Sequence, residues 1–176
     1  PITFYNISEN MGNNVFALSI LNKKVTIVLP DGQYTEAALV VIINSEITSM
    51  TAPFTSIVFK IENHRCMFMN NNSNNDGLLN FEIYKNINGS NNYMTTLGWL
   101  MGFRKTEYVI YPNALQMGES FINIFGPRYL YLILDEFKNG NPHSFLSLSR
   151  TSELSSQQIL ARITLDNTTY PFGTIL

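Results

Sequence analysis

The stretch VTIVLPDGQYT, residues 25–35, decides the fold class of the chain. Its first five positions are apolar at every second residue, which is typical of a β-strand with one buried face. Proline then ends the strand, and Asp31 and Gly32 predict a turn because both residue types tolerate a positive φ angle. Thr35 is a suitable N-cap for a helix. The stretch therefore predicts a strand, a turn and the start of a helix.

The residues that follow have the spacing of an amphipathic helix, which we predict over residues 36–47. Four apolar side chains fall on one face of this helix: Leu39, Ile42, Ile43 and Ile47. The β-branched run at 40–43 lowers helix propensity, so a strand is the alternative. A second short helix is predicted over residues 96–103. Its N-cap is Thr95 or Thr96, and the apolar residues spaced along it are Leu97, Leu100 and Met101.

Further segments have strand patterns. Apolar residues alternate in two places, at Ile57, Phe59 and Ile61 and at Phe81 and Ile83. Residues 129–134 are apolar on both faces, which predicts a strand buried on both sides at the centre of its sheet. Residues 159–165 predict the last strand.

These elements predict a mostly β, α+β fold: an antiparallel β-sheet or sandwich with two short helices. The chain has no internal repeat and no Pro-rich or Gly/Ser linker, so we expect a single structural domain over residues 1–176. About 14 residues at the N-terminus are expected to form an extended arm. Polar, turn-forming residues predict exposed loops at 70–77 and 138–144.

The composition excludes some classes of function. Charged residues make up only 14% of the chain, and the formal net charge is −2. About 25% is usual in soluble domains, and here 22 asparagines supply neutral polarity instead. Such a surface lacks the basic excess of a protein that binds nucleic acid or an anionic membrane. It fits a protein that buries much of its surface against other proteins.

The single Cys66 excludes an intrachain disulfide and leaves too few thiolates for a structural zinc site. A reducing compartment is the expected environment. No run approaches the roughly 18 apolar residues of a membrane-spanning helix.

The candidates for catalysis are few. His64 and Cys66, two residues apart, would share a face if both lay on one strand, so a nucleophile pair or metal site is the functional hypothesis. A surface histidine beside a half-buried cysteine is the favoured interpretation, because no orienting carboxylate is near in sequence. His143 stands alone, and Asp135 and Glu136 would point to opposite faces of a strand.

Two kinds of modification signal are present. Four N-x-[ST] sequons occur, at Asn6, Asn71, Asn88 and Asn167, and we interpret them as unglycosylated because a chain so rich in asparagine contains them by chance. The serine-rich segment 144–156 is interpreted as a solvated connection, with a phosphorylated segment or an extended arm as the alternatives.

Several segments together resemble one protein family. They are the stretch 25–35, LGWLMGFR at 97–104, GPRYLYLILDEF at 126–137, ILARI at 159–163 and PFG at 171–173. In this order they are similar to the virion structural proteins, of the minor capsid type, of nucleocytoplasmic large DNA viruses (giant viruses). The pattern Leu-Gly-x-x-x-Gly-Phe-Arg is the most specific part. The acidic pair before Phe137 is commonly two aspartates in such proteins, whereas here it is Asp135 and Glu136.

The resemblance singles out structural residues of the family pattern and no catalytic, cofactor-binding or metal-binding ones. These residues are Asp31, Gly32, Leu97, Gly98, Trp99, Gly102, Phe103, Arg104, Tyr129 and Asp135. Apolar residues of the second helix would pin it to the sheet, and its two glycines would allow close backbone approach. Arg104 would pair with a carboxylate or cap carbonyls at the helix end.

The function implied is that of a non-enzymatic minor capsid protein. It would bind and stabilise neighbouring major and minor capsid proteins, be oligomeric within the shell, and reach the virion by assembly in the host cytoplasm. No cofactor or nucleic-acid partner is expected, and contact with an inner membrane of the particle is left open without support from the sequence. Three alternatives also stay open. They are a penton or vertex jelly roll, a small packaged enzyme using His64, Cys66 and Asp135, and a receptor- or carbohydrate-binding sandwich with an exposed aromatic platform.

Overall fold

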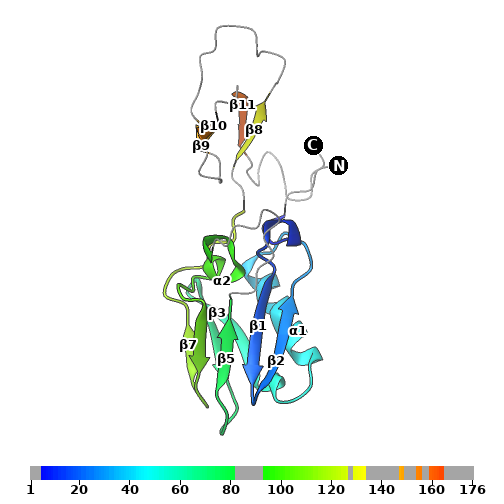
Figure 1. Cartoon of the computed structure of the whole chain (residues 1–176), viewed down its shortest axis with the longest axis vertical. Coiled ribbons are helices and arrows are strands. Elements are labelled where there is room, and N and C mark those ends of the chain that lie inside the picture. Colours follow the sequence, from blue (N-terminus) through cyan, green and yellow to red (C-terminus); the bar gives the residue numbers. More distant parts are fainter. Residues whose placement is uncertain are drawn as a thin grey trace. The chain divides into compact units, whose positions relative to one another are not determined.

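The computed structural model describes residues 5–81, 93–126, 129–133, 147–148, 154–155 and 159–164. Its contacts divide the chain into two compact units (Figure 1). One unit is Phe4–Gly126, and the other consists of Pro127–Leu176 together with Pro1–Thr3. A single domain was expected over 1–176. The observed division falls between Gly126 and Pro127, and a Gly-Pro step is too short to stand out in the sequence as a linker.

The unit Phe4–Gly126 is built on two antiparallel sheets (Figure 1). The four-stranded sheet has the order β2-β1-β5-β6, with β1 Val15–Ile20, β2 Lys23–Val28, β5 Gly77–Asn80 and β6 Glu107–Ile110. The three-stranded sheet has the order β3-β4-β7, with β3 Ile57–Glu62, β4 Arg65–Asn70 and β7 Leu115–Met117. The helical elements are α1 Glu36–Ser49 and α2 Leu97–Leu100, with 3-10 turns η1 Glu9–Met11, η2 Phe54–Ser56 and η3 Tyr93–Thr95. The predicted mostly β, α+β fold is confirmed.

The helix predicted after Thr35 is confirmed as α1. The Thr35 hydroxyl accepts a hydrogen bond from the Ala38 amide at 3.2 Å, and Leu39, Ile43 and Ile47 are fully buried. Burial of this face overrides the low helix propensity of the β-branched run.

The turn before α1 differs from the prediction, because neither Asp31 nor Gly32 has a positive φ angle. Gly32 instead forms an antiparallel bridge with Ile7, and an Asp31 carboxylate oxygen accepts from the Glu9 amide at 2.7 Å.

The expectation of an extended N-terminal arm is wrong for the described residues 5–14. Ile7 is fully buried, and Asn6 and Asn13 are almost so. The Asn6 side chain donates to Tyr34 O at 2.8 Å and to Ile124 O at 2.6 Å, and accepts from the Tyr34 amide at 2.8 Å. A polar segment can be packed in this way because its amide groups are fully hydrogen-bonded.

Buried asparagine is a general feature of this unit. Of the seven buried polar residues in the described part of the chain, five are asparagines: Asn6, Asn13, Asn14, Asn70 and Asn80. The loop predicted as exposed at 70–77 is therefore wrong at both ends, since Asn70 is buried and Gly77 is buried as the first residue of β5. Asn70 is fully buried and donates to Asn75 O and Ile110 O.

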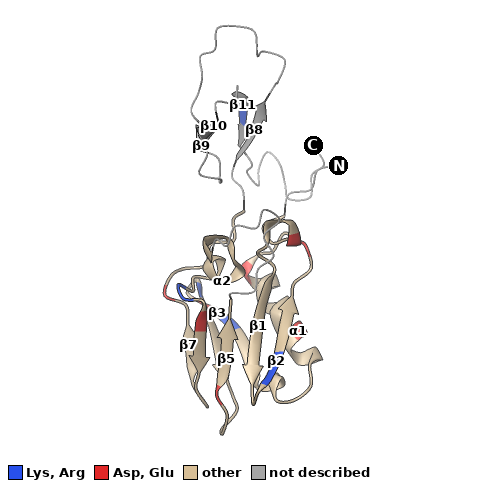
Figure 2. Cartoon of the chain, viewed as in Figure 1, with Lys and Arg blue, Asp and Glu red and all other residues tan. Residues whose placement is uncertain are grey.

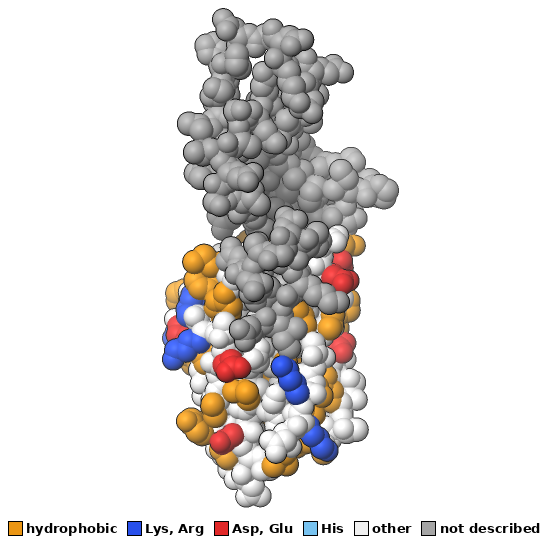
Figure 3. Space-filling view, viewed as in Figure 1, with side chains coloured by type: hydrophobic (Ala, Val, Ile, Leu, Met, Phe, Trp, Pro, Cys, Tyr) orange, Lys and Arg blue, Asp and Glu red, His pale blue; other side chains and the backbone are white. Residues whose placement is uncertain are grey.

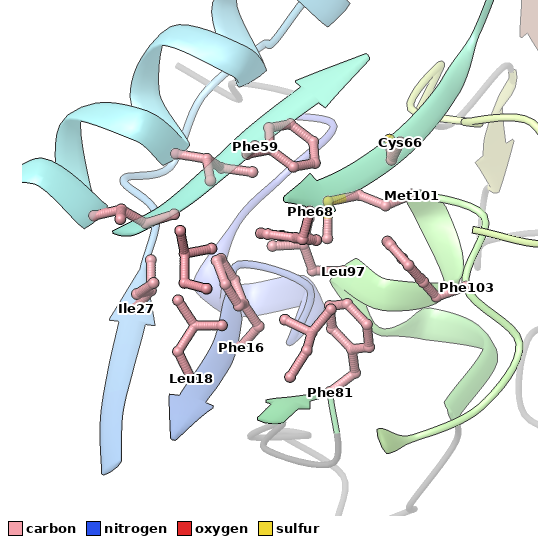
Figure 4. Close-up of a cluster of buried hydrophobic side chains, with 14 of the residues drawn as sticks. Phe16, Leu18, Ile27, Phe59, Cys66, Phe68, Phe81, Leu97, Met101 and Phe103 are labelled. Carbon is pink, nitrogen blue, oxygen red and sulfur yellow. The ribbon is translucent and has the colours of Figure 1, made fainter. Parts of the chain in front are cut away.

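A cluster of aromatic rings forms the core between the two sheets (Figure 4). Phe68 of β4 lies at its centre, with ring centroids 4.9 Å from Phe59, 5.6 Å from Phe16 and 6.0 Å from Phe103. The Phe81 ring lies 5.0 Å from that of Phe103. Phe81 was expected within a strand, but β5 ends one residue earlier and Ile83 lies outside the described residues.

Helix α1 closes the edge of β3 through one side chain. Asn44 Nδ2 donates to Phe59 O at 2.8 Å, and the Phe59 amide donates to Asn44 Oδ1 at 2.9 Å. The amide group thus forms the two hydrogen bonds that a neighbouring strand would make.

We expect Asn44→Ala to lower the free energy of unfolding by about 2 kcal/mol, because it leaves the amide and carbonyl of Phe59 without their partner. Urea denaturation measures the loss. Ser45→Ala, on the exposed side of the same helix, is the control and should change stability by less than about 0.5 kcal/mol. Equal effects of the two substitutions would contradict the role of Asn44.

In the unit that includes Pro127–Leu176, β8 Tyr129–Ile133 pairs antiparallel with β11 Ile159–Thr164. Both strands were predicted. The predicted central place of the first in its sheet is not seen among the described residues, where β8 pairs with β11 alone. Its predicted burial on both faces concerns side chains outside the described residues. The serine-rich segment contains two short paired strands, β9 Ser147–Leu148 and β10 Leu154–Ser155. The loop predicted at 138–144 also lies outside the described residues.

Candidate functional site: the surface around α2

The helix predicted over residues 96–103 is shorter than expected. In the family pattern Leu-Gly-x-x-x-Gly-Phe-Arg only Leu97–Leu100 are helical, as the one-turn helix α2, and a turn with Gly102 at φ +90° follows. Thr96 is the N-cap of α2, accepting from the Trp99 amide at 3.3 Å, as predicted. Leu97 and Phe103 are fully buried and hold the element to the core. A Cβ atom on Gly98 would lie 2.3 Å from Phe81 Cγ, so this position requires glycine.

Position 102 also requires glycine, for reasons independent of those at position 98. Its φ angle is +90°, in the left-handed region, and a Cβ atom would lie 2.1 Å from the backbone oxygen of Ser120. The Ser120 amide donates to Gly102 O at 2.9 Å. The Phe81 side chain approaches the backbone at Gly98, and the backbone of Ser120 approaches it at Gly102, as expected for this element. The contact at Gly102 holds residues 118–121 beside the turn after α2.

Arg104 lies on the face of Trp99, with its guanidinium carbon 4.0 Å from the ring centroid. Its Nη1 donates to Trp99 O and to Phe103 O, each at 3.1 Å. Of the two roles expected for Arg104, the capping of carbonyls is the one observed. Trp99 is half-buried, and one of its faces is covered by Arg104, so it is not an open aromatic platform.

Tyr108 and Glu119 fix the backbone that carries Arg104. The Tyr108 hydroxyl accepts from the amides of Arg104 and Lys105, each at 2.8 Å, and donates to the Glu119 carboxylate at 2.7 Å. The Arg104 amide also donates to Glu119 Oε2 at 3.1 Å. Tyr93 supports the same loop, because its hydroxyl donates to the carbonyls of Phe103 and Lys105.

This network shifts two pKa values in opposite directions. Burial, followed by the hydrogen bond to Glu119, raises the pKa of Tyr108 to about 12. For Glu119, burial favours the neutral form, but the hydrogen bonds from Tyr108 and from the amides of Glu119 and Arg104, with the charge of Lys105, outweigh it and lower the pKa. The carboxylate is therefore ionised and the phenol neutral at neutral pH.

The raised pKa of Tyr108 predicts how stability changes in base. The folded state holds the phenol proton more tightly than the unfolded chain, so this contribution is complete below pH 10, the ordinary value, and is lost as the pH rises to about 12. We expect the urea concentration at the midpoint of unfolding to fall between pH 10 and about pH 12, and to fall less in the Tyr108→Phe variant. An equal fall in both proteins would contradict the assignment.

Arg65 completes a group of basic residues around Glu119. Its Nη2 donates to the backbone oxygen of Glu119 at 2.8 Å, across 54 residues of sequence. Phe121, two residues further along, is 66% exposed. We call the residues Arg65, Trp99, Arg104, Lys105, Glu119 and Phe121 the α2 surface. Figure 2 shows basic residues in the loop beside α2, and in Figure 3 basic side chains lie next to hydrophobic ones on the same part of the unit.

The two residues proposed for nucleophilic chemistry are not brought together. His64 lies in the turn between β3 and β4 with a φ angle of +59°, and its exposed side chain pairs with Glu36 at 2.7 Å. Cys66 is fully buried in the core, where burial raises the pKa of its thiol (Figure 4). The shared face required by the nucleophile hypothesis is absent, because His64 lies in the turn before β4. The favoured interpretation is confirmed for the surface histidine, whereas Cys66 is fully rather than half buried.

Other candidates lie partly outside the described residues. Tyr129 belongs to β8, but its side chain is outside them, as are Asp135, Glu136 and His143. The described residues contain no group of three possible metal ligands. Within the same residues, no helix is both long enough and apolar enough to span a membrane.

Of the sequons, Asn6 is almost fully buried and its side-chain nitrogen donates two hydrogen bonds, so this fold leaves no room for a glycan on it. Asn71 is exposed. Asn88 and Asn167 lie outside the described part of the chain.

Sequence patterns did not indicate Arg65, Tyr108 or Glu119 as parts of this site. Arg65 and Glu119 meet only because β4 and β7 pair, and no local pattern encodes that pairing. Comparison with known proteins gives no further assignment, since no family model, curated protein or solved structure matches the chain.

Proposed function

We propose that this chain is a non-enzymatic structural component of the capsid of a nucleocytoplasmic large DNA virus. In this proposal it is a minor capsid protein that binds and stabilises neighbouring capsid proteins, is oligomeric within the shell, and is assembled in the host cytoplasm. The observation that carries the proposal is the α2 surface. There the most specific part of the family pattern holds Trp99 and Arg104 at the surface, backed by two obligatory glycines.

Such an arrangement suits protein binding. Tryptophan, tyrosine and arginine are the residue types that contribute most to binding energy at interfaces. Arg104 is held by the Trp99 ring and two carbonyls, so little side-chain entropy is lost when a partner binds. The low content of charged residues also fits a protein that is covered by others.

The geometry disfavours the packaged-enzyme alternative in the form that the sequence suggested. A nucleophile and its base must be within hydrogen-bonding reach. His64 is instead in an exposed turn and paired with Glu36, while the Cys66 thiol is in the core.

A jelly roll is disfavoured for the unit Phe4–Gly126 by its topology. A jelly roll has eight strands in two Greek keys. In this unit the consecutive strands β1 and β2, β3 and β4, and β5 and β6 form antiparallel neighbours, and α1 connects the first pair to the second.

Mass spectrometry of purified particles of the virus that encodes the chain tests the proposal. We expect the protein at a constant ratio to the major capsid protein across density-gradient fractions, and retained after a salt wash that removes adsorbed proteins. Its absence from the particles, or its loss in that wash, would contradict a structural role.

A further inference from the structure

The α2 surface has more positive charge than its own acidic residue can balance. Arg65, Arg104 and Lys105 surround Glu119, the one carboxylate in direct contact with this loop among the described residues. The Glu119 oxygens are already bonded to the Tyr108 hydroxyl and the Arg104 amide. The six residues of the α2 surface thus include three cations and one carboxylate. Glu62 lies opposite Arg65 in the β3–β4 pairing but is not at ion-pair distance from it.

The guanidinium groups have capacity for further acceptors. Arginine has five N–H donors, and the bonds of Arg104 to protein oxygens use Nη1 alone, while those of Arg65 use Nη2 alone. Within the part of the chain that the structure describes, the single ion pair joins His64 and Glu36. Arg65, Arg104 and Lys105 thus have no carboxylate at ion-pair distance there.

Two aromatic side chains belong to the same surface. Trp99 is half-buried and lies under the Arg104 guanidinium, and the exposed Phe121 follows Glu119 by two residues, with its backbone beside Gly102. A free phosphate or nucleic-acid backbone would satisfy the cations but not the phenyl ring. A peptide segment that carries both carboxylates and apolar side chains would satisfy both.

We propose that the α2 surface binds an acidic segment of a neighbouring capsid protein. Asp or Glu carboxylates of the partner bridge Arg65, Arg104 and Lys105, and apolar side chains of the same segment pack on Phe121 and the edge of Trp99. Planar guanidinium groups bind carboxylates through two parallel hydrogen bonds, so the two arginines fix the position of the segment. This inference rests on the proposed capsid function and names the partner chemistry for its site.

Zero-length carbodiimide coupling in intact purified particles tests the inference, because it joins a lysine amine only to a carboxylate in contact with it. We expect Lys105 to form amide bonds to an Asp or Glu of another protein chain. Lys23, Lys24 and Lys60, which are exposed elsewhere on the unit, serve as internal controls and should show few such links.

The outcomes separate the two proposals. If the chain is absent from the particles, the proposed function fails. If the chain is present but Lys105 forms no link to another protein, or formaldehyde joins Lys105 to nucleic acid instead, the partner assignment fails and the capsid role stands.

Charge reversal provides a second measurement. Lys105→Glu should reduce the amount of the protein in particles by about tenfold or more, as expected for like charges placed opposite each other at an interface. Lys60→Glu reverses an exposed charge on β3 and should leave incorporation unchanged. Lys105→Arg keeps the charge and removes the amine, so it should retain incorporation and lose the cross-link. Equal incorporation of the two Glu variants would overturn the inference.

Discussion

Replacement of Phe68 by alanine lowers the free energy of unfolding of the unit Phe4–Gly126 by about 3–5 kcal/mol, the range for a fully buried phenylalanine. Phe68 is completely buried, and its ring contacts those of Phe16, Phe59 and Phe103. It therefore joins strands of both sheets to the turn after α2. The substitution leaves a cavity that the rigid neighbouring rings cannot fill.

Urea denaturation of the full chain, followed by circular dichroism, measures this effect. Phe121→Ala is the matched control, because the same side chain is removed from a position that is 66% exposed. It should change stability by less than about 0.5 kcal/mol. A loss below about 1 kcal/mol for Phe68→Ala would contradict the position of this ring at the centre of the core.

Gly102→Ala is expected to cost about 3 kcal/mol or more, since it combines two penalties. An alanine at φ +90° is strained, and its Cβ would lie 2.1 Å from Ser120 O, which is a backbone atom with little freedom to move. Residues 118–121 would have to separate from the turn that carries Arg104. The damage should therefore be greatest at the α2 surface.

Trp99 reports on this change directly because it is the only tryptophan of the chain. Gly102→Ala should shift its fluorescence emission to longer wavelength as the Arg104 contact and the surrounding loop loosen. Gly77→Ala is the matched control. Its Cβ would meet Ile57 Cδ1 at 3.3 Å, the end of a flexible side chain, so it should cost at most about 1 kcal/mol and leave the emission unchanged. Equal shifts in both variants would contradict the role of Gly102.

Local sequence patterns predicted the elements whose structure depends on local interactions. Thr35 and Thr96 cap α1 and α2 as expected, because a cap involves residues only three apart. The strands at 25–29 and 57–61 were found from their alternation, which matches β2 and β3. These strands have one face towards the core, so the period of two is visible.

Two of the strands that were missed, β1 and β4, have no such pattern. β1 is buried along most of its length, and in β4 the consecutive residues Cys66, Met67 and Phe68 are all buried. Strands buried on both faces do not alternate. The prediction for the N-terminal residues failed for another reason. The Asn6 side chain is packed because the carbonyls of Tyr34 and Ile124, which are distant in sequence, accept hydrogen bonds from it.

The candidate site could be predicted only in part. Gly98, Gly102 and Arg104 belong to one contiguous pattern and were identified, including the role of Arg104 in capping carbonyls. Arg65 and Glu119 reach the site through strand pairing across 54 residues, which no local rule anticipates. Asp135, in contrast, lies outside the described residues, so its role stays a prediction.

A three-dimensional reconstruction of the virus particle tests the proposed capsid role most directly. The unit Phe4–Gly126 is compact enough to be fitted into the density of the shell as one body. We expect it to occupy density in the shell and to bury more than about 1,000 Å² against neighbouring proteins. A shell whose density is fully accounted for by other proteins, with none left for this unit, would contradict the proposed function.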